Sequence, residues 1–339
     1  MKPVSLAPAV TIRTDFRPET DVTAVTELHD TIYRQEFDFG GDTFTHYVSE
    51  GLRAFAQHYH PQKDRVWLCE LEGKLVGSLF LVNRGEADQL RYFLLHADCR
   101  GMGLGNQLIS EFMKCLNDRD YRSCYLLTVK GLSEAAHLYL KQGFQLTEEK
   151  ATTTFGVPLI EQRYDLHLPH IQPAQFSDAP TLRDLMEQTF IDTYAVFNTP
   201  ENMQKHIAER FELAQVQQEL QDATVQYLLM KQNEQLIGFA KLVKDHSAEG
   251  LEEQKVVEIE RIYVSHAHHG QKLGAKLMQA CLDWSKEAGF NTVWLGVWEQ
   301  NQKALAFYQK MGFQRFGEHV FVLGTEVQND FLMKKALAY

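Results

Sequence analysis

Two short glycine-rich stretches contain the residue types that bind phosphate groups. Residues 100–109 are RGMGLGNQLI, and residues 269–278, HGQKLGAKLM, repeat the pattern less strictly 169 positions later. Backbone N–H groups at the start of a helix point toward an anion, and the helix dipole favours negative charge there. Each stretch therefore predicts a phosphate-binding loop followed by a helix, starting at Gly103 in the first copy and at Lys272 in the second.

The spacing of the glycines excludes the two common nucleotide-binding loops. Gly101, Gly103 and Gly105 alternate, whereas the Rossmann fingerprint is G-x-G-x-x-G directly after a first strand. The second stretch, GQKLGAK, lacks both the spacing and the hydroxyl residue of a P-loop. Both loops also come after three strand-like segments, so a nucleotide must be held in another way.

The elements around these loops occur twice in the same order. Tyr139 and Tyr308 are also 169 residues apart, as are the two Gly-Phe pairs that follow them. Each half opens with a helical region, at about 21–60 and about 178–220, followed by three strands and the loop with its amphipathic helix. A strand, a helix ending in Gly-Phe and terminal strands complete each copy. Such a series of matches indicates an internal duplication.

The junction between the copies is DLHLPHIQPAQFSD. We expect Pro169 and Pro173 to interrupt both helices and strand pairing there. The sequence therefore predicts two domains, 11–168 and 169–339. Because strands alternate with helices in each copy, the fold class is α/β in the broad sense, a mixed α+β layer structure.

Composition limits the class of protein. A formal net charge of −11 over 339 residues argues against a nucleic-acid partner, which needs a basic surface, and is compatible with a polycationic substrate. Five cysteines without Cys-x-x-Cys spacing indicate reduced thiols. No stretch resembles a signal peptide or a membrane span, so we expect a soluble cytoplasmic protein. The histidines of HYH (58–60) and HAHHG (266–270) lack nearby cysteine or carboxylate ligands, so we expect no metal.

The first loop resembles a known family motif. Arg100-Gly101-Met102-Gly103-Leu104-Gly105 is similar to the R/Q-x-x-G-x-G/A motif of the GNAT superfamily of N-acetyltransferases. AAHLYLKQGF and NQKALAFYQKMGF resemble the helix of that family with its tyrosine and closing Gly-Phe. The resemblance covers about 11–168 and 170–337. The second half resembles PaiA-type spermidine/spermine acetyltransferases, and the first half resembles the acetyltransferase part of MarR-fused regulators.

The resemblance implies two tandem GNAT domains. Each would be a mixed, mostly antiparallel sheet flanked by helices, with a splayed strand pair that admits acetyl-CoA as cosubstrate. Strand backbone groups would hold the pantetheine arm, and loop amides would hold the pyrophosphate. The cofactor-binding residues so implied are Leu94, Leu95, Arg100, Gly101, Gly103, Leu104, Gly105, Asn106 and Tyr139 in the first half, and Ile262, Tyr263, Val264, His269, Gly270, Gln271, Lys272, Leu273, Gly274, Ala275 and Asn301 in the second.

The same resemblance implies three catalytic residues in the second half. Glu258 lies eleven residues before His269, where many members of the family have their general base. Glu260, two residues on, would face the same side of the strand, and the two like charges would raise one pKa. Tyr308 would be the general acid that protonates the CoA sulfur. The alternatives are two solvated surface glutamates and a packed aromatic ring. Asn301 is expected both to cap a helix and to bind the pantetheine arm.

The two copies differ at these positions. The first keeps the glycines but has Gln89 where the second has Glu258. The second has His269 in place of Arg or Gln, and Lys272 in place of the middle glycine. We expect catalysis mainly in the second half. It is left open whether the first half binds CoA, acts weakly on another amine or only braces its twin.

These observations predict an acetyl-CoA-dependent N-acetyltransferase that acts on a primary amine of a small molecule, with polyamines as the leading class. Two alternatives remain: a non-catalytic CoA-sensing module, and a protein or peptide N-acetyltransferase. The amine and the oligomeric state, including a homo-oligomer, are not fixed by the sequence, because substrate-lining residues come from variable helices and loops.

Overall fold

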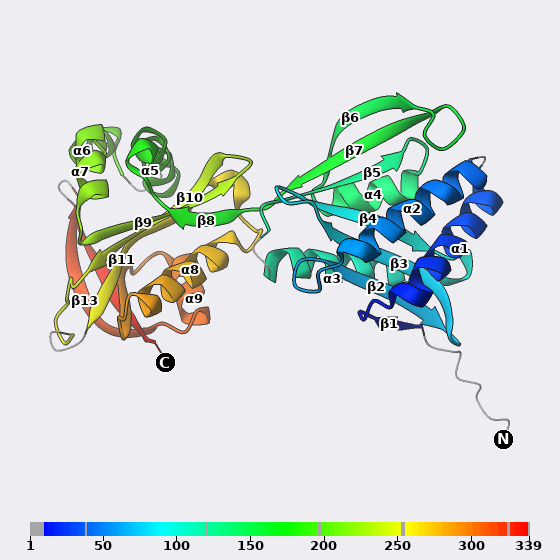
Figure 1. The fold of residues 1–339 in the computed structure, drawn as a ribbon. Helices are drawn as coiled ribbons and strands as arrows, with labels where there is room; N and C mark the ends of the chain where they lie inside the picture. Colours follow the sequence, from blue (N-terminus) through cyan, green and yellow to red (C-terminus); the bar gives the residue numbers. More distant parts are fainter. Residues whose placement is uncertain are drawn as a thin grey trace, which may run out of the picture. The chain divides into compact units, whose positions relative to one another are not determined.

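The computed structural model describes residues 10–37, 39–118, 121–195, 198–251, 255–323 and 326–337. The chain divides into two compact units, Met1–Leu168 and Pro169–Tyr339, called here the N-terminal and the C-terminal unit (Figure 1). Each unit contains one of the two sequence copies.

The N-terminal unit opens with two helices packed against each other. Helix α1 begins with Pro18 in its first turn, where the missing N–H costs nothing, and Glu19 and Asp21 complement the helix dipole there. The elements of the unit are β1 (Thr11–Arg13), α1 (Pro18–Glu36), α2 (Asp42–His58), β2 (Arg65–Leu71), β3 (Lys74–Asn83), β4 (Asp88–Leu95), α3 (Leu104–Asp118), β5 (Ser123–Val129), α4 (Ser133–Lys141), β6 (Gln145–Thr152) and β7 (Leu159–His167).

The C-terminal unit repeats this order with one more helix near its start. Its elements are β8 (His170–Pro173), α5 (Ala179–Tyr194), α6 (Pro200–Arg210), α7 (Leu213–Gln221), β9 (Val225–Gln232), β10 (Gln235–Lys244), β11 (Val256–Val264), α8 (Leu273–Glu287), β12 (Thr292–Trp298), α9 (Gln302–Lys310), β13 (Gln314–Leu323) and β14 (Glu326–Ala336). Helix α6 has Pro200 at its start, and the Thr199 side chain accepts a hydrogen bond from Asn202 N at 3.3 Å.

Each unit is built on a seven-stranded sheet. The strand order is β1-β2-β3-β4-β5-β7-β6 in the N-terminal unit and β13-β14-β12-β11-β10-β9-β8 in the C-terminal unit. Among the described pairings, only β4 with β5 and β11 with β12 run parallel. The expected mixed, mostly antiparallel sheets flanked by helices are confirmed.

Both faces of each sheet are covered. In the C-terminal unit, α8 and α9 pack on one face around Leu277, Cys281 and Val293, while α5 to α7 cover the other face around Met186 and Leu229. The N-terminal unit repeats the arrangement with α3 and α4 on one face and α1 and α2 on the other. The amphipathic period seen in the sequence thus places each loop helix directly on its sheet.

Two boundaries differ from the sequence expectations. The loop helices begin at Leu104 and Leu273, one residue later than predicted, with Lys272 in the capping position. The junction was expected to interrupt strand pairing, yet Pro173 is the last residue of β8, which pairs with β9. Strand β8 is at the edge of its sheet, where a missing N–H is tolerated.

Within the described residues, none of the helices combines the length and the apolar character that crossing a membrane requires. All five cysteines lie in this part of the chain, and each is a free thiol.

Candidate functional site

Both glycine-rich loops form left-handed turns just before their helices. Gly101 and Gly103 have φ of 73° and 81°, and Gly270 has φ of 81°. Lys272 occupies the position of Gly103 and adopts φ of 61°. A Cβ atom at Gly103 would meet no atom within 4 Å, so a lysine at this position costs backbone strain of about 1–2 kcal/mol but no clash. The second loop therefore keeps the same left-handed turns without its middle glycine.

The first residue of each loop is bonded to the end of the preceding strand. Arg100 Nε donates to Leu95 O at 3.0 Å, and His269 Nε2 lies 2.9 Å from Val264 O at the matching position. A carbonyl oxygen only accepts, so Nε2 carries the proton in that contact. Arg100 also forms a two-fold ion pair with Glu36, at 2.5 and 3.0 Å. His269 thus reproduces the strand contact of the arginine.

The parallel strands separate in both units. Strand β11 pairs with β12 only from Val256 to Glu258, although it continues to Val264. On its other edge, β11 pairs with β10, and the register of that pairing shifts by one residue at Glu260, which forms a β-bulge. In the N-terminal unit, β4 pairs with β5 only over three residues, and its bulge contains Tyr92 at φ of 50°. The splayed strand pair expected for acetyl-CoA is present twice.

A cavity of about 910 Å³ follows the opening in the N-terminal unit. It runs along β4 and β5 to the loop and the start of α3. All nine residues that the sequence assigned to cofactor binding in this half line it: Leu94, Leu95, Arg100, Gly101, Gly103, Leu104, Gly105, Asn106 and Tyr139. The N-terminal unit therefore has one continuous cavity from the glycine-rich loop to the strand residues Gln89 and Leu90.

The cavity of the C-terminal unit is smaller, about 540 Å³. Of the residues assigned from the sequence, those that line it are Glu260, Ile262, Tyr263, Val264, His269, Asn301 and Tyr308. The loop residues Gly270, Gln271, Lys272, Leu273, Gly274 and Ala275 lie outside its lining, as does Glu258. Phe307 stands where the first copy has Leu138, and a Cβ atom at Gly274 would lie 3.9 Å from its ring. The larger ring takes up space at the start of α8.

The two glutamates expected to be catalytic, Glu258 and Glu260, differ in their position relative to this cavity. The Glu258 side chain is 13% exposed and is 2.5 Å from His246 Nδ1. Burial raises the pKa of Glu258, and the nearby Glu260 adds to the rise, while His246 opposes it. Burial rather than like charge is thus the larger cause. Glu260 lines the cavity and pairs with Lys241 at 3.0 Å. Glu258 therefore lies outside the lining of the cavity, on the same strand as Glu260 and two residues before it.

Tyr308 and Asn301 are arranged on α9. Asn301 Oδ1 accepts a hydrogen bond from Ala304 N at 3.1 Å, which confirms the expected helix cap. Burial raises the pKa of Tyr308, so the phenol stays protonated at neutral pH. Tyr139 has the same environment in the N-terminal unit, where burial likewise raises its pKa. The first copy has Leu132 at the cap of α4, and no side-chain hydrogen bond forms there.

Sequence reasoning missed a matched pair of carboxylates, one in each cavity. Asp330 on β14 is the register partner of Trp298 on the neighbouring strand β12. Glu161 on β7 is likewise the register partner of Val129 on β5. Both carboxylates line their cavities, and burial raises the pKa of Asp330. The two positions are 169 residues apart, so the duplication offset was a signal that could have found them. Tyr194 of α5 also lines the C-terminal cavity and hydrogen-bonds Tyr263.

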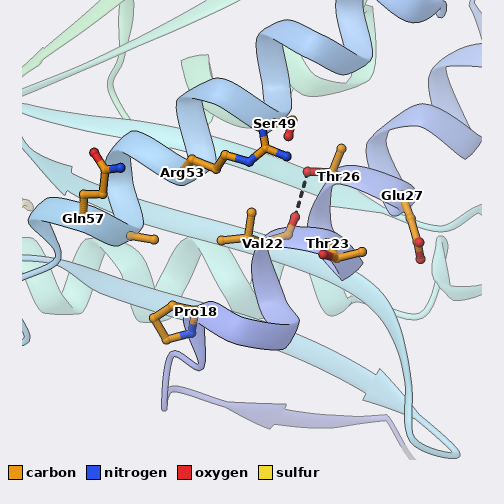
Figure 2. Close-up of a pocket in the computed structure, with 9 residues that line it drawn as sticks. Pro18, Val22, Thr23, Thr26, Glu27, Ser49, Arg53 and Gln57 are labelled. Atoms are coloured by element: carbon orange, nitrogen blue, oxygen red, sulfur yellow. Dashed lines mark hydrogen bonds between the residues drawn. The ribbon is translucent and has the colours of Figure 1, made fainter.

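A separate groove lies between α1 and α2 on the N-terminal unit, with a volume of about 460 Å³ (Figure 2). Pro18, Val22, Ser49 and Arg53 are among the residues that line it. None of its lining residues belongs to a loop or a splayed strand. In the described ranges, no group of three or more His, Cys, Asp or Glu side chains is placed to hold a metal ion.

Comparison with known proteins places both units in one family. The acetyltransferase (GNAT) family model matches residues 184–313, and a GNAT domain model matches residues 62–146. An uncharacterized N-acetyltransferase from the pepI 3' region of Lactobacillus delbrueckii subsp. lactis is 34% identical over 160 residues, which is 47% of this chain and 92% of that protein. An uncharacterized N-acetyltransferase of Mycobacterium tuberculosis is 28% identical over 161 residues, 48% of this chain and 99% of that protein.

Among solved structures, the PaiA N-acetyltransferase from Thermoplasma acidophilum in complex with coenzyme A is similar at 23% identity and a TM-score of 0.42. The match covers 50% of this chain and 99% of that one. The family models and the Lactobacillus relative, together with the doubled loop, the splayed strands and the cavity beside them, support one conclusion. The chain belongs to the GNAT family of acetyltransferases, carries two such domains in tandem, and is an N-acetyltransferase.

Proposed function

We propose that the C-terminal unit transfers an acetyl group from acetyl-CoA to a primary amine of a small molecule, with a polyamine as the favoured acceptor. One observation carries the proposal: Tyr308, Glu260 and Asp330 line a single cavity where β11 and β12 separate, and Glu258 lies two residues before Glu260 on β11. These are the proton-donating and proton-accepting groups that amide formation from an ammonium ion needs.

Acetyl-CoA supplies the activated acetyl group. The backbone from Ile262 to Val264 would hold its amide arm, because this part of β11 pairs with β10 on one edge and no longer pairs with β12 on the other. The pyrophosphate would lie at the N–H groups at the start of α8, near Lys272. Tyr308, held protonated by burial, is the group that would donate a proton to the departing sulfur.

The acceptor reaches the site as an ammonium ion, since an alkylamine has a pKa of about 10. Glu258 would accept its proton through a water or through Glu260, because Glu258 itself is not among the residues that line the cavity. Its raised pKa makes it a stronger base than an exposed carboxylate. Asp192 and Asp330 also line the cavity and form no ion pair in the described part of the chain, so they are the groups suited to hold further positive charges.

We further propose that the N-terminal unit also binds acetyl-CoA, on the strength of its continuous cavity. Free cysteines and an acidic charge balance support a cytoplasmic protein that acts without a metal or a nucleic-acid partner.

The test is release of the CoA thiol with a panel of acceptors: spermidine, spermine, monoamines and lysine-containing peptides. The proposal expects the highest kcat/KM with the polyamines. Turnover of the peptides with none of the polyamines would favour a peptide N-acetyltransferase, and CoA binding without turnover of any amine would favour a sensing module.

A further inference from the structure

The far end of the N-terminal cavity has a wall of aromatic rings. Six rings line the cavity here. They are Tyr33 on α1, Phe37 and Phe39 between α1 and α2, Phe44 and Tyr47 on α2, and Phe155 between β6 and β7. Neighbouring rings contact one another: the centroids of the tilted pair Tyr33 and Phe44 are 4.5 Å apart, and those of the edge-to-face pair Tyr47 and Phe155 are 5.2 Å apart. Such a wall suits a flat, apolar group.

Two opposite charges face the same space. Glu161 lines the cavity, and its strand partner Val129 packs in the same cluster as Phe44. Arg91 also lines the cavity, with its guanidinium over the Tyr92 ring at 4.7 Å and a hydrogen bond to Tyr47 Oη at 3.4 Å. Neither charge takes part in an ion pair within the described residues. Both side chains are partly exposed, so water solvates them in the free protein, and a ligand with one positive and one negative group would pair with both.

Tyr92, the residue after Arg91, also lines this cavity. Tyr92 Oη is buried and has no hydrogen-bond partner in the described part of the chain. Tyr92 lies in the β-bulge with φ of 50°, which is rare for a bulky residue. Buried hydroxyls are almost always satisfied, and strained residues cluster at functional sites. The C-terminal unit has Arg261 at this position and Glu260 at that of Arg91, so the two acceptor ends differ in chemistry.

We propose that the N-terminal unit acetylates the α-amine of a free aromatic amino acid. The rings of the wall hold its side chain, Glu161 holds its ammonium group and Arg91 holds its carboxylate. The acceptor nitrogen attacks the thioester carbonyl of acetyl-CoA, so a C–N bond forms as the C–S bond breaks. The nitrogen loses two protons in all, one of which goes to the CoA sulfur and the other to solvent. This activity is separate from the polyamine acetylation proposed for the C-terminal unit.

The experiment measures CoA thiol release by the full chain with three acceptors: L-tryptophan, tryptamine, which lacks the carboxylate, and spermidine. With L-tryptophan, we expect Glu161→Gln to lower kcat/KM by about ten- to a hundredfold, as for the loss of one charge-assisted contact. Arg91→Gln should lower kcat/KM for L-tryptophan by a similar factor and leave tryptamine almost unchanged. Both side chains are partly exposed, so neither change leaves a core cavity.

Tyr308→Phe is the matched control in the C-terminal unit. It should reduce spermidine turnover and spare L-tryptophan turnover, while Glu161→Gln should do the reverse. The proposal is overturned if the wild type neither acetylates L-tryptophan nor binds it by calorimetry in the presence of CoA. It is also overturned if L-tryptophan turnover depends on Tyr308 and not on Glu161. Absence of spermidine turnover alone would count against the polyamine proposal and leave this one standing.

Discussion

Replacing Glu258 by glutamine keeps the shape of the side chain and removes its ability to take a proton. General acid–base groups contribute about 10²–10⁴-fold to rate, so kcat/KM for spermidine should fall by that factor. The loss corresponds to about 2.7–5.4 kcal/mol of transition-state stabilisation. The side chain is only 13% exposed and contacts His246, so the glutamine should stay in place and the loss should reflect proton transfer.

The effect should depend on pH in a defined direction. Burial raises the pKa of Glu258, so wild-type activity should decline as pH falls through that pKa, because the base is then already protonated. The difference between wild type and variant should therefore be largest above this pKa and below the amine pKa of about 10. At higher pH, free amine accumulates and the variant should recover part of its rate.

The assay is CoA thiol release with spermidine across this pH range, and His246→Ala provides a second check. His246 lowers the pKa of Glu258, so its removal should raise that pKa and move the acidic limb of the profile to higher pH. His246 is 58% exposed, so the substitution should leave the core intact. A loss of tenfold or less in Glu258→Gln, together with an unmoved acidic limb in His246→Ala, would show that Glu258 is not the base.

Three further outcomes are expected. Gly103→Glu places bulk and negative charge at the first glycine-rich loop and strains a backbone φ of 81°. Calorimetry should therefore show that the variant binds one equivalent of CoA fewer than the wild type. Unchanged stoichiometry would mean that this loop does not bind CoA. Tyr308→Phe should lower kcat for spermidine and leave the affinity for acetyl-CoA nearly unchanged, whereas Tyr139→Phe should leave polyamine turnover almost intact. Asp330→Asn should raise Tm at neutral pH. Burial raises the pKa of the Asp330 carboxyl, so the folded protein loses stability as pH rises through that pKa and the buried group becomes charged. The asparagine stays neutral and avoids this loss. The gain in Tm should vanish below about pH 4, where the carboxyl is neutral in both folded and unfolded chains.

Much of the fold could be predicted because the duplication doubles each weak signal. A glycine-rich loop alone is ambiguous, but two loops at one offset, each after three strands, fix the order of the elements. The amphipathic spacing of α8, with Leu277 and Cys281 on one face, determines which side meets the sheet. The splayed strands came from family resemblance, since strand pairing over such distances has no local pattern in the sequence.

The extent of each cavity could not be predicted, because it depends on packing between distant elements. Phe307 and Leu138 are both apolar helix residues, and only the structure shows that the larger one lies beside the start of α8. Asp330 and Glu161 were missed because they lie on terminal strands, and the cross-sheet pairing that brings them to the cavities is non-local. Whether the first half relates to MarR-fused regulators stays an expectation.

The most direct test of the central claim is a crystal structure of the full chain soaked with acetyl-CoA. We expect the pantetheine arm between β11 and β12, with the sulfur beside Tyr308, and a second molecule between β4 and β5 with its pyrophosphate at the start of α3. Acetyl-CoA absent from both strand openings at saturating concentration, or bound elsewhere on the chain, would contradict it.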